Sequence, residues 1–140
     1  TDKEMRLLDG VKRINLSFCK WISDATVLLL SGIHTVNLAG CNITDDSIQS
    51  LAGVHTIDLS FTRVTDRGVI PLAGVHTIGL ERTSITDSSL QALAGVHTIN
   101  ISYTKITDNG IKCLAGVYSI ELERTNVTDE GVRSLAGGHC

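Results

Sequence analysis

The chain has 140 residues, enough for one domain with a continuous core. Only 19% of the residues are charged and 4% are aromatic, which indicates a folded chain whose core is filled mainly by Leu, Ile, Val, Ala and Thr. The formal net charge of −3 gives no electrostatic footprint for nucleic acid. No apolar run approaches the roughly 18 residues of a membrane-spanning helix, so neither a nucleic acid nor a membrane is expected as a partner.

The first residues, Thr1-Asp2-Lys3-Glu4, are polar and show no signal peptide. The four cysteines, at positions 19, 41, 113 and 140, lack the C-x-x-C spacing of a structural zinc site. Together these features favour a reducing, cytoplasmic setting. A mature secreted chain that has already lost its signal is the alternative.

A repeat of 21 residues runs through the chain. Leu51-Ala52-Gly53-Val54 recurs at 72–75, 93–96 and 114–117, and residues 30–33 fit the same phase. The first unit is longer by one residue, with Trp21 as the expected insertion. The prediction is one domain over residues 1–140, made of a half unit (1–7), six units (8–134) and a partial unit or cap (135–140).

Each unit predicts a strand followed by a short helical return. In the third unit the alternation of apolar and polar residues predicts a half-buried strand around residues 56–60. Thr65 and Asp66 can both accept hydrogen bonds from backbone N–H groups just downstream, so both are expected to act as caps. Gly53 is expected to allow a tight entry into the next strand, where a Cβ would be unwelcome.

One such unit cannot bury its own apolar side, whereas stacked units bury all of them together. The predicted fold is therefore an α/β right-handed solenoid, with a parallel sheet on the concave face and short helices on the convex face.

The pattern Val-x-x-Ile-x-Leu-x-x-Thr-x-Val of residues 54–64 resembles the leucine-rich repeat. Cys19 and Cys41 take the Thr position in the first two units, which is similar to the cysteine-containing subtype found beside F-boxes. The Thr-Asp-x-Gly motifs resemble a second subtype, found in bacterial, protist and large-DNA-virus arrays. The resemblance implies a leucine-rich-repeat solenoid in which the Cys/Thr column points inward and hydrogen-bonds the loop backbone. It implies little about function, because arrays of this family bind unrelated partners.

Both ends of the chain fall within a repeat. Residues 1–11 align with residues 65–75 without a gap, and residues 135–140 begin a unit. The sequence is expected to be either a piece of a longer array or a small protein whose half units serve as caps.

Residues one period apart should stack at the strand spacing of about 4.8 Å, so each repeat position forms a column. His34, His55, His76 and His97, continued by Tyr118, are interpreted as a structural ladder, hydrogen-bonded along the array, because equivalent side chains do not converge on a metal. Stacked imidazoles should tolerate charge poorly, so stability should fall below about pH 6.

The other ladders are also interpreted as structural. Fixed repeat positions bring no His and carboxylate to Cys19 or Cys41, so neither is expected to be a nucleophile. The repeated Thr-Asp pairs lack the spacing of calcium sites. No cofactor, metal or catalytic residue is predicted.

Columns that vary from unit to unit carry the predicted partner-binding surface on the sheet side. In one of them, guanidinium groups and aromatic rings alternate within cation–π reach, as Phe61, Arg82, Tyr103 and Arg124. Exposed aromatic and Arg side chains are typical of interface hot spots, and Gly40 and Gly79 should leave depressions for partner side chains. The predicted partner-binding residues are Phe18, Trp21, Asp58, Phe61, Arg63, Glu81, Arg82, Tyr103, Lys105, Glu121, Glu123 and Arg124.

The first hypothesis is a protein-interaction module that binds a protein partner through its concave face, with a ubiquitin-ligase adaptor as one specific form. The alternative is a structural or surface-display solenoid, such as an adhesin or virion component. An enzyme is not expected, because no acid–base pair interrupts the repeat. Exposed end units could also promote end-to-end or edge self-association.

Overall fold

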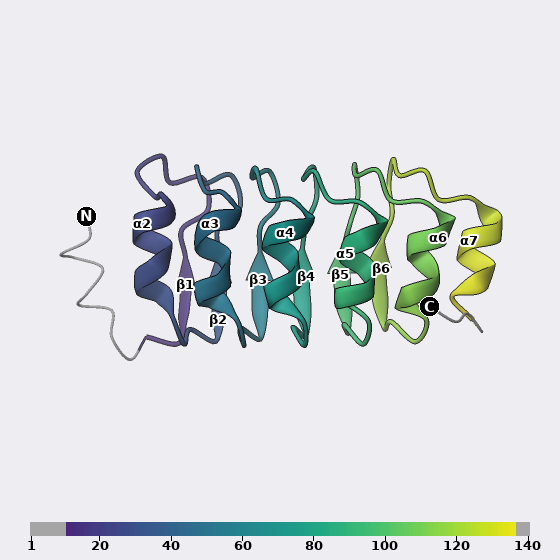
Figure 1. Ribbon diagram of the computed structural model, residues 1–140, viewed down its shortest axis with the longest axis horizontal. Helices are drawn as coiled ribbons and strands as arrows, with labels where there is room; N and C mark the ends of the chain where they lie inside the picture. The colour runs from purple at the N-terminus through teal and green to yellow at the C-terminus, as the bar shows by residue number, and fades with distance from the viewer. Residues whose placement is uncertain (1–10, 137–140) are drawn as a thin grey trace.

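The computed structural model describes residues 11–136. Six parallel strands form one open sheet in the order of the sequence, and a helical return segment follows each strand (Figure 1). The strands are β1 (Arg13–Asn15), β2 (Thr35–Asn37), β3 (Thr56–Asp58), β4 (Thr77–Gly79), β5 (Thr98–Asn100) and β6 (Ser119–Glu121).

The return segments lie in a second layer against one face of the sheet (Figure 1). Most of them combine one α-helical turn with one 3-10 turn, as in α4 (Asp66–Val69) and η4 (Ile70–Leu72). The others are α2 (Asp24–Val27), η2 (Leu28–Leu30), α3 (Asp45–Ile48), η3 (Gln49–Leu51), α5 (Asp87–Ala92), α6 (Asp108–Ile111), η5 (Lys112–Leu114) and α7 (Asp129–Ser134). The predicted α/β solenoid is confirmed.

The register of the sheet follows the repeat. Thr56 pairs with Thr77 and Thr77 with Thr98, each 21 residues further on, whereas Arg13 pairs with Thr35 across 22 residues. The extra residue of the first unit therefore lies between β1 and α2, as predicted, and Trp21 in that turn is 90% exposed.

The core is a single stack of aliphatic layers between the strands and the helices. In each inner unit the strand and the residue after it contribute two buried side chains, such as Ile57 and Leu59, and the return segment adds two more, such as Val69 and Leu72. The layer at the end of the described chain is more open, because Ile120 and Leu122 are only partly buried there. Self-association through such an end stays a prediction.

The predicted strand over residues 56–60 is longer than the observed one. Regular strand pairing ends at Asp58, although Leu59 still donates its N–H to Gly79 of the next unit (2.8 Å). Ser60, expected to face solvent, is buried, since the chain is already turning and its Oγ accepts the N–H of Glu81 (3.1 Å).

The prediction that a Cβ would be unwelcome at Gly53 is confirmed by the backbone. Its φ is +89°, a conformation that glycine adopts without steric cost and that other residues adopt only with strain. The strain arises from the backbone alone, because a Cβ at this residue would meet no atom within 4 Å.

The Thr-Asp pairs do more than cap helices. Thr44, Thr86 and Thr107 accept the N–H two residues downstream, as expected of an N-cap. The Asp side chains, predicted to act in the same way, point instead to the following unit. Asp66 accepts both the N–H (2.8 Å) and the Oγ1–H (2.5 Å) of Thr86, and Asp24, Asp45, Asp87 and Asp108 make equivalent pairs of bonds.

Each of these carboxylates joins one unit to the next, a contact we call the Asp–Thr clamp. Ser89 Oγ adds a third bond to Asp66, and Ser47 Oγ does the same to Asp24 (2.7 Å). Burial alone would raise the pKa of Asp66, but the hydrogen bonds from Ser89 and Thr86 outweigh it and lower the pKa below its usual 3.8. The clamp therefore favours the ionised carboxylate.

Candidate protein-interaction surface

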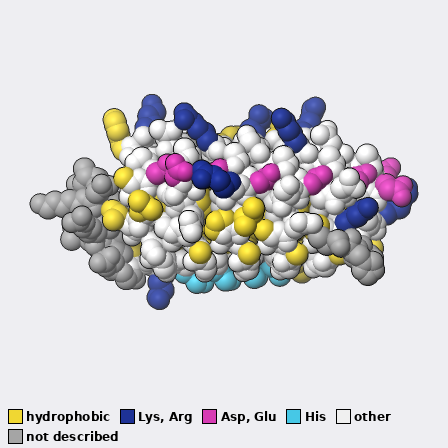
Figure 2. All heavy atoms as spheres, in the orientation of Figure 1, with side chains coloured by type: hydrophobic (Ala, Val, Ile, Leu, Met, Phe, Trp, Pro, Cys, Tyr) yellow, Lys and Arg dark blue, Asp and Glu magenta, His cyan; other side chains and the backbone are white. Residues whose placement is uncertain are grey.

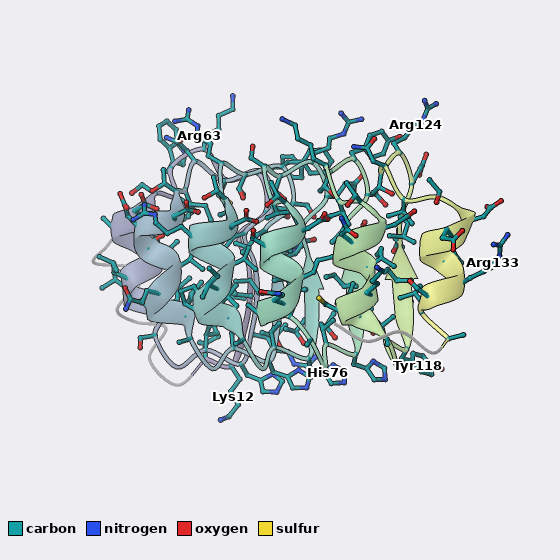
Figure 3. All side chains as sticks on the ribbon, turned by 45° about the vertical axis from the view of Figure 1, so that its right-hand side comes forward. Lys12, Arg63, His76, Tyr118, Arg124 and Arg133 are labelled. Carbon is teal, nitrogen blue, oxygen red and sulfur yellow. The ribbon has the colours of Figure 1, made fainter. Side chains whose placement is uncertain are left out.

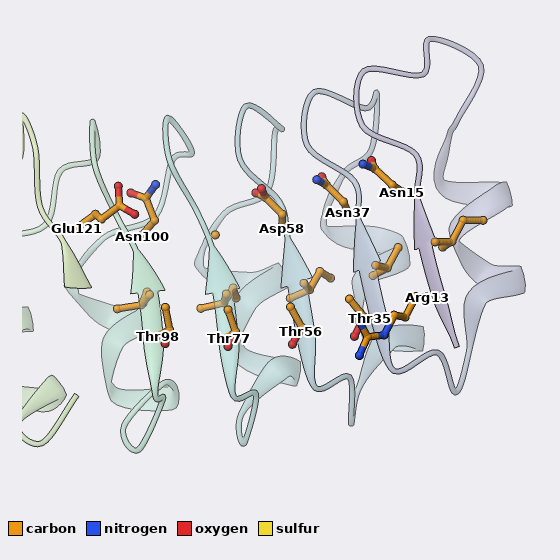
Figure 4. Close-up of a pocket in the computed structure, with 16 residues that line it drawn as sticks. Arg13, Asn15, Thr35, Asn37, Thr56, Asp58, Thr77, Thr98, Asn100 and Glu121 are labelled. Carbon is orange, nitrogen blue, oxygen red and sulfur yellow. The ribbon is translucent and has the colours of Figure 1, made fainter. Parts of the chain in front are cut away.

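The exposed face of the sheet is a shallow groove of about 570 Å³. Two rows of polar side chains stand on its floor, one of Thr at the start of the strands and one of Asn, Asp and Glu at their ends (Figure 4). The first row comprises Thr35, Thr56, Thr77 and Thr98, and the second Asn15, Asn37, Asp58, Asn100 and Glu121.

The groove contains two of the predicted binding residues, Asp58 and Glu121, but sequence reasoning missed its Thr row. The same residue recurs along this row, whereas the binding residues were predicted from positions that vary between units. The gap expected at Gly79 is closed, because the Asp58 carboxylate lies 2.6 Å from where a Cβ of Gly79 would stand.

A second surface lies where the chain turns away from the strands. One residue of each unit there has a left-handed backbone, and we call these residues the loop-edge column. They are Phe18, Gly40, Phe61, Arg82, Tyr103 and Arg124, with φ between +57° and +70°. Five of the six are large L-residues in a conformation that costs roughly 1–2 kcal/mol for any residue but glycine.

The backbone holds this column firmly. Each of its members from Phe18 to Tyr103 donates its N–H to a carbonyl of the next unit, as Phe61 does to Glu81 (2.8 Å) and Tyr103 to Glu123 (2.8 Å). These bonds continue the ladder of the sheet beyond the strands. The side chains therefore project from a backbone that is already ordered.

The side chains of the column touch in sequence. The rings of Phe18 and Phe61 are 6.1 Å apart, and Arg82 Cζ lies 5.9 Å from the centre of Phe61 and 4.1 Å from that of Tyr103. The predicted cation–π contacts are thus confirmed for Arg82. Among the described residues, Arg124 makes none.

The depression predicted at Gly40 is closed. The ring of Phe18 lies over this glycine, in the space that a Cβ would take. No partner side chain can enter without displacing Phe18, which is 65% exposed and offers its outer face instead.

The opposite edge of the sheet carries the histidine ladder (Figure 2, cyan). Neighbouring rings of His34, His55, His76, His97 and Tyr118 lie 4.4–4.5 Å apart and within 12–16° of parallel. Contrary to the prediction, the described imidazoles are not hydrogen-bonded to one another along the array. Each bonds the threonine that follows it in its own unit, as His55 Nδ1 does to Thr56 Oγ1 at 2.8 Å.

Desolvation between the neighbouring rings, together with the charges of His34, His76 and Arg13, lowers the pKa of His55. Within residues 11–136, no group of three or more His, Cys, Asp or Glu side chains is arranged to hold a metal ion. The same part of the chain has no helix of the length and apolarity needed to cross a bilayer.

The Cys/Thr column points inward and bonds loop carbonyls. Thr62, Thr83 and Thr104 each donate to the carbonyl three residues earlier (2.6–2.7 Å), whereas the Cys41 thiol donates to Leu16 of the preceding unit (3.0 Å). Burial raises the pKa of Cys41, which disfavours the nucleophilic thiolate.

Comparison with protein-family models identifies the repeat. The model described as Leucine Rich repeat matches residues 33–52, 54–73 and 96–115, which are three units of the stack. These units are leucine-rich repeats. A comparison with curated protein sequences found no match.

Solved leucine-rich-repeat structures share the fold. An internalin (inlF) of Listeria monocytogenes superposes with a TM-score of 0.72 at 14% identity, over 96% of this chain and 42% of that one. Internalin C2 (inlC2) of the same organism gives 0.68 at 18% identity, covering 96% and 70%. A structure described as a TLR13–ssRNA13 complex gives 0.60 at 14%, covering 96% and 25%. The chain thus spans less than half the length of the inlF protein.

Most of the predicted binding residues of the leucine-rich-repeat chain lie at the loop edge. Arg63 and Arg124 project from it, on the side of the sheet opposite His76 and Tyr118 (Figure 3). Glu81 is half-buried and Glu123 exposed, and Glu123 accepts a hydrogen bond from the Tyr103 hydroxyl (3.2 Å). Asp58 and Glu121 belong to the groove instead.

Proposed function

We propose that the chain is a protein-interaction module, and that it binds its partner through the loop-edge column and the adjoining groove of the sheet. One observation carries the proposal. Five units place a large side chain on a left-handed residue where the second unit has glycine, the residue that fits without strain. Strain that is kept in several units at an exposed position favours a role for the side chains themselves.

The side-chain types support the same conclusion. Phe61 is 44% exposed and Trp21 90% exposed, although both are large apolar residues. Aromatic and Arg side chains contribute most to protein interfaces, because they bury a large area at a small cost in rotamer freedom.

The rival explanation is that the column is a stacking ladder that serves stability alone. Arg124 argues against it, since this residue bears the left-handed backbone but has no ring contact among the described residues. A surface-display solenoid without a dedicated soluble partner is the second candidate function, and both rivals predict that the column can be changed without loss of binding.

The test compares two double variants in affinity capture and in thermal melting. Phe61→Ala with Tyr103→Ala changes the column, and Lys112→Ala with Arg133→Ala changes the helical side as a matched control. We expect a captured protein that the first variant loses by about tenfold or more and the control retains. Loss of melting temperature with unchanged capture would establish the ladder explanation instead.

Nucleic acid is a further ligand to test, because the TLR13 relative is described as a complex with single-stranded RNA. The proposal is that the chain acts as a binding protein and not as an enzyme. An oligonucleotide serves as a competing ligand in the binding measurements.

A further inference from the structure

We propose that the partner segment recognised at the loop edge is an acidic polypeptide, extended along the solenoid axis. This inference rests on the proposed function and specifies its ligand. It starts from charge, since Lys and Arg side chains gather along this edge (Figure 2, dark blue).

The cations come from two neighbouring columns. Arg82 and Arg124 belong to the loop-edge column, and Lys20, Arg63 and Lys105 lie two residues beyond it in the first, third and fifth units. We call these five residues the basic rim. Glu81 and Glu123 lie in the same turns, and Asp58 and Glu121 stand at the ends of the adjoining strands, so five cations face four carboxylates here, in a chain whose formal net charge is −3.

The cations of the basic rim form no ion pair within residues 11–136. Over that part of the chain, ion pairs join only Arg67 to Asp45 and Asp46, and Arg133 to Glu130. Glu123, the carboxylate next to Arg124, is engaged by the Tyr103 hydroxyl. Five exposed cations without an ion-pair partner can be complemented by an anionic ligand.

Arg82 is prepared for such a ligand. Its guanidinium carbon lies over both the Phe61 and the Tyr103 ring, 5.9 and 4.1 Å from their centres, and the guanidinium forms no ion pair within residues 11–136. A stacked guanidinium of this kind suits bidentate bonds to a carboxylate in the same plane.

The same stacking favours a peptide over single-stranded nucleic acid. Nucleic acid bound without sequence preference uses aromatic faces on which bases stack. Here Arg82 Cζ lies 4.1 Å from the centre of the Tyr103 ring, so one face of this ring is already occupied, whereas Phe61 is 44% exposed and lies 5.9 Å from Arg82 Cζ. Carboxylates need only the N–H edges.

The aromatic residues at one end of the loop edge predict the orientation of the bound peptide. Phe18 and Trp21 are 65% and 90% exposed, and both lie in the first unit, beyond Arg63. An acidic segment with an apolar residue at one end would place that residue here. The six rungs span about 24 Å at about 4.8 Å each, a length that about seven extended residues cover.

The experiment is a selection from a displayed library of random peptides about 12 residues long, followed by binding measurements on the enriched sequences. The rim variant combines Arg63→Glu, Lys105→Glu and Arg124→Glu, which are exposed residues outside the core. The matched control combines Lys12→Glu, Lys112→Glu and Arg133→Glu, so that both variants have the same net charge. Melting curves confirm that each is folded.

We expect enriched peptides rich in Asp and Glu, with affinity at least about tenfold lower for the rim variant than for the control. Their affinity should also fall when NaCl rises from about 50 to about 300 mM. Peptides that depend on the rim but are not acidic would overturn this inference and leave the proposed function standing. Peptides that bind both variants equally would overturn this inference, and the proposed function falls with it only if Phe61→Ala with Tyr103→Ala also leaves their binding unchanged.

An oligo(dT) about 12 nucleotides long is measured in parallel. We expect it to bind more weakly than the acidic peptides. Tighter, rim-dependent binding of the oligonucleotide would overturn the choice of a polypeptide.

Discussion

The two edges of the sheet use the same repeat in opposite ways. At one edge, four units in succession present the same imidazole, stacked on its neighbours at 4.4–4.5 Å. At the other, the loop-edge column changes between Phe, Gly, Arg and Tyr and holds five residues in a strained backbone. Positions that repeat without change serve the contact between units, and positions that vary are available for recognition.

The largest expected effect concerns a repeated position, the Asp–Thr clamp. Asp66→Ala removes the acceptor of three hydrogen bonds, from the Thr86 N–H, the Thr86 hydroxyl and the Ser89 hydroxyl. We expect the free energy of unfolding to fall by about 2–3 kcal/mol, measured by urea denaturation. Asp129→Ala is the control, because Asp129 accepts no side-chain bond from a following unit among the described residues; an equal loss there would contradict the role of the clamp.

The next effect separates backbone conformation from packing. Gly40 and Gly53 both have positive φ, +70° and +89°, but only Gly40 lies under the Phe18 ring. Gly53→Ala should cost about 1 kcal/mol from strain alone, whereas Gly40→Ala should cost about 1 kcal/mol more because Phe18 must move. Thermal melting of both variants measures the difference, and equal costs would show that the Phe18 ring yields freely.

At a variable position of the loop-edge column, we expect a substitution to raise stability. Arg124→Gly relieves the left-handed backbone at φ +58° and should stabilise the chain by about 1 kcal/mol, while Arg124→Ala should change little. Urea denaturation of the two variants measures the difference in their free energies of unfolding. If the glycine variant is less stable than the alanine variant, the side chain is retained for stability and the contrast between the edges fails.

The smallest effect tests the histidine ladder through pH. Since the pKa of His55 is lowered from 6.5 in the folded chain, its contribution to stability is present above pH 6.5 and is lost as pH falls through the lowered value. His55→Tyr should keep the stack, as Tyr118 does on His97 at 4.5 Å, and reduce the loss of melting temperature between pH 7.5 and 5. An unchanged pH dependence would show that His55 is not its source.

A second acid transition belongs to the clamps. The pKa values of Asp24, Asp66 and Asp108 are all lowered, so their stabilisation is present above pH 3.8 and is lost below it. Melting curves from pH 7.5 to 3 should therefore show two separate declines.

The repeat alone predicted the fold, because a 21-residue period with fixed apolar positions has one way to bury them all. The pairing of Arg13 with Thr35 and the exposed turn at Trp21 also followed from counting residues. The direction of the Asp side chains did not, since a Thr-Asp pair before a helix looks the same whether its carboxylate caps that helix or bonds the next unit.

The predicted binding residues were recognisable because they vary, but their backbone conformation was not. Nothing in the letters of Phe61 or Arg82 signals a positive φ; only glycine at position 40, in the same phase, hinted at it. The filled space at Gly40 and Gly79 was missed for a related reason. A missing side chain leaves room that a neighbour in the next or preceding unit can take, and sequence periodicity does not say which one does.

The alternation of aromatic and basic residues at the loop edge determines what the duplication of repeat units would add to this surface. An aromatic residue followed two positions later by a cation occurs in the first, third and fifth units, as Phe18 with Lys20, Phe61 with Arg63 and Tyr103 with Lys105. Duplication of a unit pair would therefore lengthen the basic rim without altering any existing contact. Each added pair of units would give a long ligand further binding sites along the axis. Its avidity would then rise with the number of units, because binding at one site raises the effective concentration of the ligand at the next.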